Sequence, residues 1–426
     1  MVRKLKHTEI GDIPVDWELQ TFDETFRVIS NNTLSRENLN NRGGAVRNIH
    51  YGDILTKFPE VLDCNEEEIP YVNELSLLSS STQLLQDGDI VVADTAEDET
   101  VGKVIEVQNL GDSKLVAGLH TIPCRVKKGE FAPGWLGYYM NSDLFHNQIL
   151  PYITGIKVSS ISKGAISETL ILVPPFDEQE KIVQSLNKIQ LLMTTETKVV
   201  NKIKLVKNGC LSKMFPQKDD TVPEMRLPGF NEAWEQRKLG ELAEIVGGGT
   251  PSTSVNSYWD GDIDWYAPAE IGEQIYLESS QRKITEEGLN KSSAKILPIG
   301  TVLFTSRAGI GKTAILQKEG CTNQGFQSIV PNKEKLDSYF IFTRSEELKR
   351  YGETVGAGST FVEVSGKQMA NMELMMPKTM AEQRQIGNYF QSIDNLITLH
   401  QCKCDKYSNI KKGMMSDLLT GKIRLV

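Results

Sequence analysis

Residues 177–215 read DEQEKIVQSLNKIQLLMTTETKVVNKIKLVKNGCLSKMF, and this stretch returns in altered form near the end of the chain. Its first part, DEQEKI, matches AEQRQI at 381–386. Its last part, KNGCLSKMF, matches KKGMMSDLL at 411–419, and both matches have an offset of 204 residues (177 to 381, 207 to 411). A constant offset over roughly 40 residues means that no insertion is tolerated there, as expected of a continuous helix and not of loops.

Apolar side chains in both copies recur at alternating steps of four and three residues, over about five heptads. This spacing is typical of a coiled-coil seam. Each copy predicts a helix of about 36 residues, or about 54 Å at ~1.5 Å per residue. The apolar stripe of so long a helix needs a partner, and the other copy is the obvious one. The predicted seam residues are Ile182, Leu186, Ile189, Met193, Val200, Ile203, Ile386, Phe390, Ile393, Ile397, Cys404 and Tyr407.

The repeat continues outside these helices, but there its offset changes along the chain. Such drift is expected where loops gain or lose residues. Short β-type runs followed by helical stretches indicate a mixed α/β domain in each copy. The matched segments, with offsets falling from 217 through 212 to 209, are 17–18 with 234–235, 84–93 with 296–305, and 101–103 with 310–312.

The two copies are separated by MFPQKDDTVPEMRLPGF (214–230), in which Pro216, Pro223 and Pro228 stop the first helix and indicate an extended linker. The chain is therefore predicted to be an α/β (α+β) tandem repeat, in which two globular domains alternate with two long helices. The predicted divisions are domain 1 at 1–175, a central helix at 176–215, a proline-rich linker at 216–231, domain 2 at 232–378 and a C-terminal helix at 379–426.

Net charge and cysteine usage indicate which partners and which cellular compartment the protein can have. The formal net charge is −9, but residues 57–100 hold twelve acidic residues and one basic residue, Lys57, so this segment carries −11 and the remainder +2. The remainder can therefore present basic faces to nucleic acid. The six cysteines are scattered, no apolar run is long enough to span a membrane, and the N-terminus lacks the apolar core of a secretory signal. These features predict a cytoplasmic protein.

Two motifs suggest binding of a nucleotide or a methyl donor, and each lacks a required feature. SRAGIGKT (306–313) has Ser306 where a phosphate-binding loop needs glycine, and its acid-rich counterpart at 94–104 would repel a triphosphate. VPPF (173–176) has Val173 where the motif of amino-methyltransferases has Asp or Asn, and no glycine-rich cofactor loop precedes it. A structural hairpin and a proline-terminated strand explain the two segments better.

No catalytic or metal-binding constellation stands out. Asp337, Glu347 and Lys349 fit only a loose nuclease pattern, with the last two on a polar helical face. His400, Cys402 and Cys404 are spaced two residues apart on one predicted helix, about 200° around its axis, so their side chains cannot converge on a metal. We therefore predict no catalytic, cofactor-binding or metal-ligating residue, and the chain is not expected to be an enzyme.

In these segments the chain resembles a known family, the specificity (S) subunits of type I restriction-modification systems. The resemblance covers essentially the whole chain, and two target-recognition domains alternating with two long helices is a specific arrangement. The stretches that carry it are IGDIPVDW (10–17), PPFDEQEKI (174–182), VPEMRLPGFNEAWEQRKLGEL (222–242), TVLFTSRAGIGKTAIL (301–316), TNQGFQSIV (322–330) and PKTMAEQRQI (377–386).

The resemblance implies a sequence-specific DNA-binding subunit. Each recognition domain would read one half of a bipartite double-stranded DNA target in the major groove. The two helices would pack as an antiparallel coiled coil and set the spacer between the half-sites. The implied partners are two methyltransferase subunits and restriction subunits, which would hold AdoMet, ATP and Mg²⁺, so this chain is expected to carry no cofactor. The first domain has AGLHTIPCRV (117–126) where the second has TNQGFQSIV, so the two should read different half-sites.

DNA contacts are expected from Arg, Lys, Asn and Gln side chains on loops of the two domains, because these side chains bind phosphates and base edges. Two other functions stay open: a coiled-coil scaffold whose domains bind proteins and, less favoured, a nucleotide-binding enzyme of the phosphate-loop type. The candidate DNA-contact residues are Lys103, Lys157, Arg307, Lys312, Asn323 and Gln324.

Overall fold

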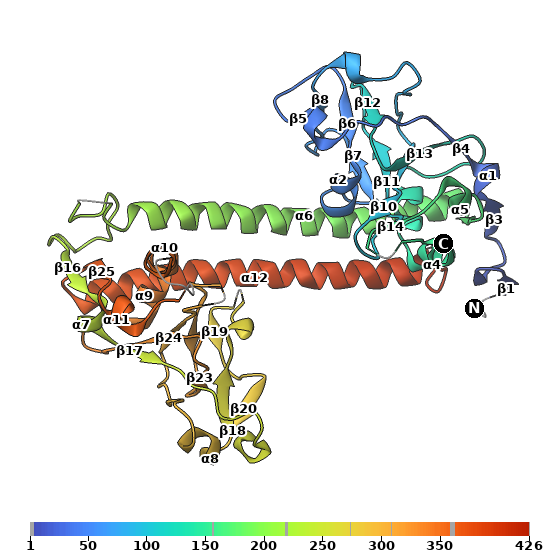
Figure 1. Cartoon of the computed structure of the whole chain (residues 1–426). Helices are drawn as coiled ribbons and strands as arrows, with labels where there is room; N and C mark the ends of the chain where they lie inside the picture. Colours follow the sequence, from blue (N-terminus) through green and yellow to red (C-terminus); the bar gives the residue numbers. More distant parts are fainter. Residues whose placement is uncertain are drawn as a thin grey trace. The chain divides into compact units, whose positions relative to one another are not determined.

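The structure is a computed structural model of the chain (Figure 1). The chain divides into two compact units: unit 1 is Met1–Glu196 with Lys403–Val426, and unit 2 is Thr197–Cys402. Each unit holds part of each of two long helices and one mixed sheet domain, called here the first and the second sheet domain. The residues that the structure describes are 4–155, 157–217, 220–272, 274–307, 309–357 and 363–425.

The two long helices are present as predicted. Helix α6 runs over Phe176–Lys213 and helix α12 over Met380–Leu418. α6 begins after the pair Pro174–Pro175 and ends before Pro216, because proline is tolerated at the start of a helix but not in its interior. Among the described residues, none of the helices is both long and apolar enough to cross a membrane.

Helix α12 ends earlier than predicted, at Leu418 and not at residue 426. The chain turns at Gly421, whose φ of 70° lies in the left-handed region that glycine favours at helix ends. Gly421 N donates to Leu418 O at 3.2 Å. The turn brings Arg424 back to Glu178, in the first turn of α6.

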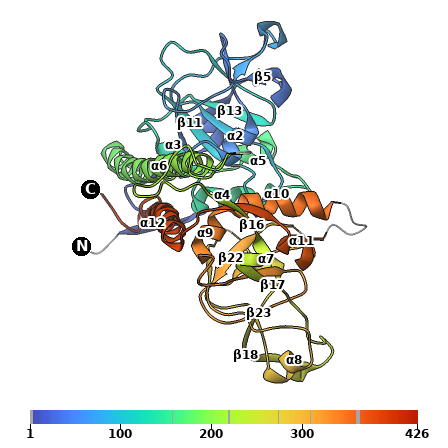
Figure 2. The ribbon, with the colours of Figure 1, turned by 90° about the vertical axis from the view of Figure 1, so that its left-hand side faces the viewer.

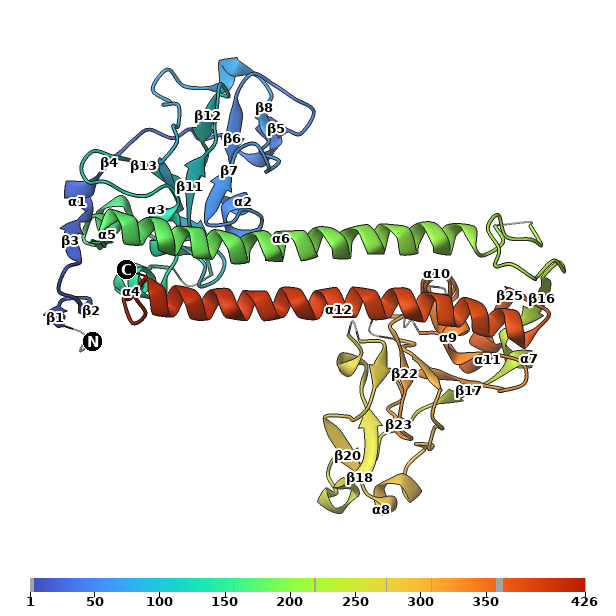
Figure 3. The same cartoon turned by 180° about the vertical axis from the view of Figure 1, so that it is seen from behind.

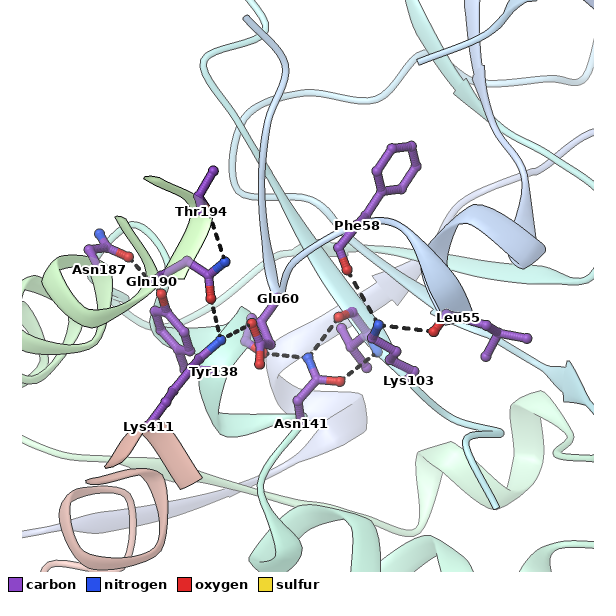
Figure 4. A network of polar contacts seen from close by, with 12 residues as sticks. Leu55, Phe58, Glu60, Lys103, Tyr138, Asn141, Asn187, Gln190, Thr194 and Lys411 are labelled. Atoms are coloured by element: carbon purple, nitrogen blue, oxygen red, sulfur yellow. Dashed lines mark hydrogen bonds and ion pairs between the residues drawn. The ribbon is translucent and has the colours of Figure 1, made fainter. Parts of the chain in front are cut away.

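A buried lysine joins both long helices to the first sheet domain in unit 1 (Figure 4). Lys411 of α12 has an 8% exposed side chain, and its Nζ donates to Gln190 Oε1 of α6 at 2.7 Å and to Glu60 Oε2 at 2.5 Å. The same ammonium lies 5.4 Å from the centre of the Tyr138 ring, whose hydroxyl donates to Asn187 Oδ1 of α6 at 2.8 Å. The Lys411 ammonium thus links α12, α6 and the first sheet domain.

Within each unit the two long helices run antiparallel, as the resemblance implied. In unit 2, Lys207 Nζ of α6 donates to Asp394 Oδ1 of α12 at 2.6 Å, and the hydroxyl of Tyr339 donates to Asp394 Oδ2 at 2.8 Å. Asp394 therefore joins the two helices to the sheet domain here, because it accepts from both Lys207 and Tyr339. In the pairs of residues that meet, residue numbers rise along α6 as they fall along α12. The pairs are Gln190–Lys411 and Glu196–Lys403 in unit 1, and Lys207–Asp394 and Cys210–Tyr389 in unit 2.

Most of the predicted seam is deeply buried where the long helices carry a sheet domain. Ile182 and Leu186 share a core with Leu418 in unit 1, and Phe390 shares one with Phe340 in unit 2. The buried seam residues are Ile182, Leu186, Ile189, Val200, Ile386, Phe390 and Ile393, and those of intermediate exposure are Met193, Ile203, Ile397, Cys404 and Tyr407.

Replacing Lys411 by methionine should destabilise unit 1 by about 2 kcal/mol, because the carboxylate of Glu60 then stays partly buried without its cation. The neighbouring substitution Lys412→Met is the control, since Lys412 is exposed. Thermal melting of the full chain measures both. Equal melting temperatures for the two variants would contradict the structural role of Lys411.

The first sheet domain has a five-stranded sheet in the order β4-β13-β9-β11-β7 and a four-stranded sheet in the order β12-β6-β8-β5 (Figure 3). Its strands are β1 Leu5–Thr8, β2 Gly11–Pro14, β3 Glu18–Thr21, β4 Phe26–Val28, β5 Leu39–Asn40, β6 Arg47–Ile49, β7 Val61–Asp63, β8 Tyr71–Val72, β9 Ile90–Ala93, β10 Thr95–Ala96, β11 Val104–Gln108, β12 Leu115–Ala117, β13 Thr121–Val126, β14 Ser159–Ser160 and β15 Leu170–Val173. Its helices are α1 Phe22–Thr25, α2 Tyr51–Thr56, α3 Trp135–Tyr139, α4 Asp143–Ile149 and α5 Lys163–Ser167.

The second sheet domain has a five-stranded sheet in the order β17-β24-β21-β22-β19 and a three-stranded sheet in the order β20-β18-β23, with α7 and α11 packed against β17 (Figure 2). Its strands are β16 Glu235–Lys238, β17 Ala243–Gly247, β18 Trp259–Tyr266, β19 Tyr276–Leu277, β20 Arg282–Ile284, β21 Val302–Phe304, β22 Thr313–Leu316, β23 Cys321–Thr322, β24 Gln327–Pro331 and β25 Glu373–Met376. Its helices are α7 Leu239–Leu242, α8 Glu286–Asn290, α9 Ser338–Thr343, α10 Ser345–Gly356 and α11 Gly366–Ala370.

The two five-stranded sheets have the same topology. In both, the fourth strand pairs with the third antiparallel and with the fifth parallel, and the other neighbours are antiparallel. The central strands are fully buried, as in the run IVVA of β9 and VLF of β21, and this explains their continuous apolar sequence. The sequence repeat is therefore a structural repeat.

Each sheet domain is anchored to a long helix by a tryptophan. Trp17 Nε1 donates to Glu178 Oε2 at 2.9 Å, and Arg424 Nε donates to Glu178 Oε1 at 2.6 Å. The same three-residue anchor recurs in unit 2 around Glu382. These contacts explain why the tryptophan at the start of each copy is part of the repeat.

Candidate nucleic-acid interface

In each unit, four loop segments meet at one end of the five-stranded sheet, which we call the loop end. In unit 1 they follow β4, β6 and β9 and connect β12 with β13. In unit 2 they follow β17, β18 and β21 and connect β23 with β24. The backbone bonds that join them, from N to O, are Asn32–Ala117 (2.8 Å), Gly118–Ile49 (2.9 Å) and Asp94–His120 (3.1 Å) in unit 1, and Gly249–Thr322 (2.8 Å), Asn323–Tyr266 (3.0 Å) and Ser306–Gly325 (2.8 Å) in unit 2.

These bonds make the two loop ends equivalent position by position. Residues 118–120 of the first sheet domain correspond to residues 323–325 of the second, and Asp94 corresponds to Ser306. The pattern of backbone hydrogen bonds is thus the same, while the side chains that it carries differ. This is the arrangement expected of a rigid scaffold that presents variable binding loops.

The loop end of unit 2 offers two amide side chains. The Oδ1 of Asn323 accepts from Gly325 N at 2.7 Å, and the Oε1 of Gln324 accepts from the hydroxyl of Thr250. In the described part of the chain, no hydrogen bond uses Asn323 Nδ2 or Gln324 Nε2. Both NH₂ groups can therefore donate outward, and amide side chains are suited to base edges.

Arg307 and Lys312 lie on the hairpin between β21 and β22, next to this loop end. The side chain of Arg307 is 36% exposed and its Nη1 lies 3.8 Å from Glu363 Oε2, and Lys312 is exposed. The long ion pair of Arg307 and the exposure of Lys312 leave both cations able to contact phosphate. The hairpin leads into an antiparallel strand and not into a helix, so the described residues of 306–313 do not form a phosphate-binding loop.

The loop end of unit 1 carries an aromatic cluster that the sequence reasoning missed. The ring of His50 stacks on Tyr51 with centroids 4.7 Å apart, and Tyr51 meets the ring of His120 edge-on at 5.2 Å. Burial lowers the pKa of His50, with the charge of Arg36 adding to the effect. The departure of AGLHTIPCRV from TNQGFQSIV marked the segment that contains His120, but isolated histidines gave no further indication.

Lys103 binds within its own domain. Its Nζ donates to Leu55 O at 3.2 Å and to Phe58 O at 3.3 Å, so it binds carbonyls at the end of α2 (Figure 4). Burial lowers the pKa of Lys103, which is the opposite of what a phosphate contact would do. Lys157, in contrast, is exposed in the turn before β14.

The sequence model described as "Type I restriction modification DNA specificity domain" matches residues 14–205 and again residues 231–406. The chain is 27% identical over 428 residues to the putative type I restriction enzyme MjaX specificity subunit of Methanocaldococcus jannaschii, covering 99% of this chain and 96% of that protein. It is 26% identical over 230 residues to the EcoR124I/EcoR124II specificity subunit of Escherichia coli, covering 52% and 53%.

Solved structures share the fold. The S subunit of a type I restriction-modification system from M. genitalium superposes with a TM-score of 0.62 at 14% identity, covering 98% of this chain and 99% of that chain. A structure described as the basis of complex assembly and conformational transition of the type I system superposes with a TM-score of 0.55 at 17% identity, covering 96% and 99%.

Proposed function

The chain belongs to the family of type I restriction-modification DNA specificity subunits, which recognise DNA with two domains, and from that premise we propose how its parts divide the task. Residues 1–175 read one half of a bipartite duplex target, and residues 232–378 read the other. The observation that carries this division is the loop end, built twice on one backbone frame with different side chains. Asn323 and Gln324 are the proposed base readers of the second domain.

The long helices set the spacer between the half-sites. Both α6, with 38 residues, and α12, with 39, continue from one unit into the other. At about 1.5 Å per residue each is roughly 57 Å long, which is an upper limit of about 16 or 17 base pairs at ~3.4 Å each. A helix does not stretch, so its length is a suitable ruler.

Specificity subunits of this family assemble with methyltransferase and restriction subunits, and we propose that this chain docks two copies of the methyltransferase. Two apolar residues are exposed at equivalent places in each unit. Leu192 is 44% exposed and Ile410 39% in unit 1, while Leu396 is 47% exposed and Val206 51% in unit 2. Two like surfaces suit two like partners.

On this proposal the chain catalyses nothing and works in the cytoplasm, where the DNA is. AdoMet, ATP and Mg²⁺ belong to the partner subunits. The purified chain should show no methylation, cleavage or ATP hydrolysis. Co-expression with its methyltransferase subunit should yield sequence-specific methylation at a bipartite motif, read by methylation sequencing. Absence of any DNA binding by that complex at low salt would favour a protein-binding scaffold instead.

Removing Arg307 and Lys312 together should lower the salt dependence of DNA binding. Each phosphate contact contributes about −0.9 to the slope of log K against log salt concentration, so the double alanine variant should lose up to about 2 from the slope. Lys103→Met is the control, because its ammonium binds the carbonyls of Leu55 and Phe58. That variant should melt at a lower temperature with an unchanged slope. An unchanged slope for the double variant would remove both residues from the interface.

A further inference from the structure

His120 has a backbone conformation that side chains rarely adopt. Its φ is 56°, in the left-handed region, whereas Gly325, at the equivalent place in the second sheet domain, lies outside that region. Non-glycine residues in this region are strained, and such strain persists where the surroundings hold it, most often at functional sites. At this position the chain thus has an imidazole side chain, although a glycine would adopt the same backbone conformation with less strain.

The surroundings hold the ring of His120 in place. The ring meets Tyr51 edge-on, and Tyr51 is stacked in turn on His50, whose Nδ1 accepts from Gly52 N at 3.1 Å. The backbone O of His120 accepts from Asp94 N. Even so, the His120 side chain remains 45% exposed. A positioned but accessible ring is suited to contact a ligand and not to fill a core.

Hydrogen bonding determines which nitrogen of His120 carries the proton. The hydroxyl of Thr95 donates its one hydrogen to Asp94 Oδ1 at 2.7 Å. His120 Nδ1, 3.2 Å from Thr95 Oγ1 and 3.4 Å from Asp94 Oδ1, must therefore be the donor. In the neutral ring Nε2 is then an acceptor. No described residue donates a hydrogen bond to it.

The charges nearby decide what this acceptor binds. The hairpin beside His120 carries Asp94 and the acidic run 97–99, and its one lysine, Lys103, binds backbone carbonyls of its own domain. The equivalent hairpin of unit 2 carries Arg307 and Lys312 instead. Carboxylates repel phosphate and the two acceptor atoms of guanine. The major groove offers donors only on the exocyclic amino groups of adenine and cytosine.

We infer that His120 determines specificity in the first sheet domain, the Nε2 of its neutral imidazole accepting a hydrogen bond from the exocyclic amino group of an adenine or cytosine in the first half-site. The inference rests on the proposed function, because it requires that the loop end of unit 1 enters the major groove. It adds the residue, the atom and the chemical class of base.

The test removes the exocyclic amino group of the base, by a base analogue, and the imidazole of His120, by substitution. Each is removed alone and then both together. The full chain, in complex with its methyltransferase subunit, is titrated with duplexes in which each adenine of the first half-site is replaced in turn by purine, and each cytosine by 2-pyrimidinone. Wild type should lose about tenfold in affinity at one position. His120→Gly should lose about tenfold on the natural duplex and be indifferent to the amino group there. The base whose analogue shows this coupling identifies adenine or cytosine.

Two variants separate base reading from a structural role. His120→Asn tolerates the left-handed backbone and supplies an amide acceptor, so it should retain part of the discrimination. His7→Gly removes an exposed histidine of the same unit and should change nothing. The inference is overturned if His120→Gly responds to every amino group as wild type does, or weakens binding to all duplexes equally. Failure of the wild-type complex to select any sequence would instead contradict the proposed function.

Discussion

Replacing Arg226 by alanine should lower the free energy of unfolding of unit 2 by about 3 to 5 kcal/mol, because it leaves a buried carboxylate without its cation. Arg226 Nε and Nη2 donate to the two oxygens of Glu382 at 2.8 and 2.9 Å. The side chains are 12% and 3% exposed. Trp234 Nε1 donates to Glu382 Oε1 at 3.1 Å but brings no charge to replace the guanidinium. Denaturant titration followed by tryptophan fluorescence measures the loss.

The repeat supplies a matched control. Arg424 binds Glu178 as Arg226 binds Glu382, but Arg424 is 20% exposed and its other partner, Asp16, is 47% exposed. Water can compensate more of its loss, so Arg424→Ala should cost less than Arg226→Ala. The double variant Arg226→Met with Glu382→Leu should recover most of the stability. A loss below about 1 kcal/mol for Arg226→Ala would show that the pair does not stabilise the anchor.

Inserting four residues after Val199 should lengthen the recognised spacer by about one to two base pairs and leave both half-sites unchanged. Four residues add about one helical turn, or roughly 6 Å. Because α6 and α12 are antiparallel, a matched insertion after Gln401 keeps the flanking pairs Gln190–Lys411 and Lys207–Asp394 in register. The doubly extended variant should therefore give the same longer spacer with better stability. Methylation sequencing reads the motif directly.

A linker insertion is the control for the spacer. Four residues of glycine and serine after Thr221 lie beyond the end of α6 and should leave the motif as it is. The ruler would be wrong if the helix insertion left the spacer unchanged, or if the linker insertion altered it.

Much of the architecture could be predicted because it is encoded locally. The offset of 204 and the heptad spacing predicted two continuous helices, and α6 is found at Phe176–Lys213 against a predicted 176–215. The end of α12 was missed, since the left-handed turn at Gly421 depends on one glycine and not on periodicity. The candidate DNA contacts were predicted from residue type and from an expected position on loops. Type does not reveal direction, and Lys103 points toward carbonyls of its own domain.

The repeat and the two long helices could be predicted from the sequence, because helical periodicity depends on residues three and four positions apart. The tertiary structure alone decided which residues share a loop end. His120 meets Tyr51, and Arg424 meets Glu178, across separations that no local pattern records. Strand order brings His120 to Tyr51, whereas the turn at Gly421 after α12 brings Arg424 to Glu178, so both contacts depend on the packing of the whole chain.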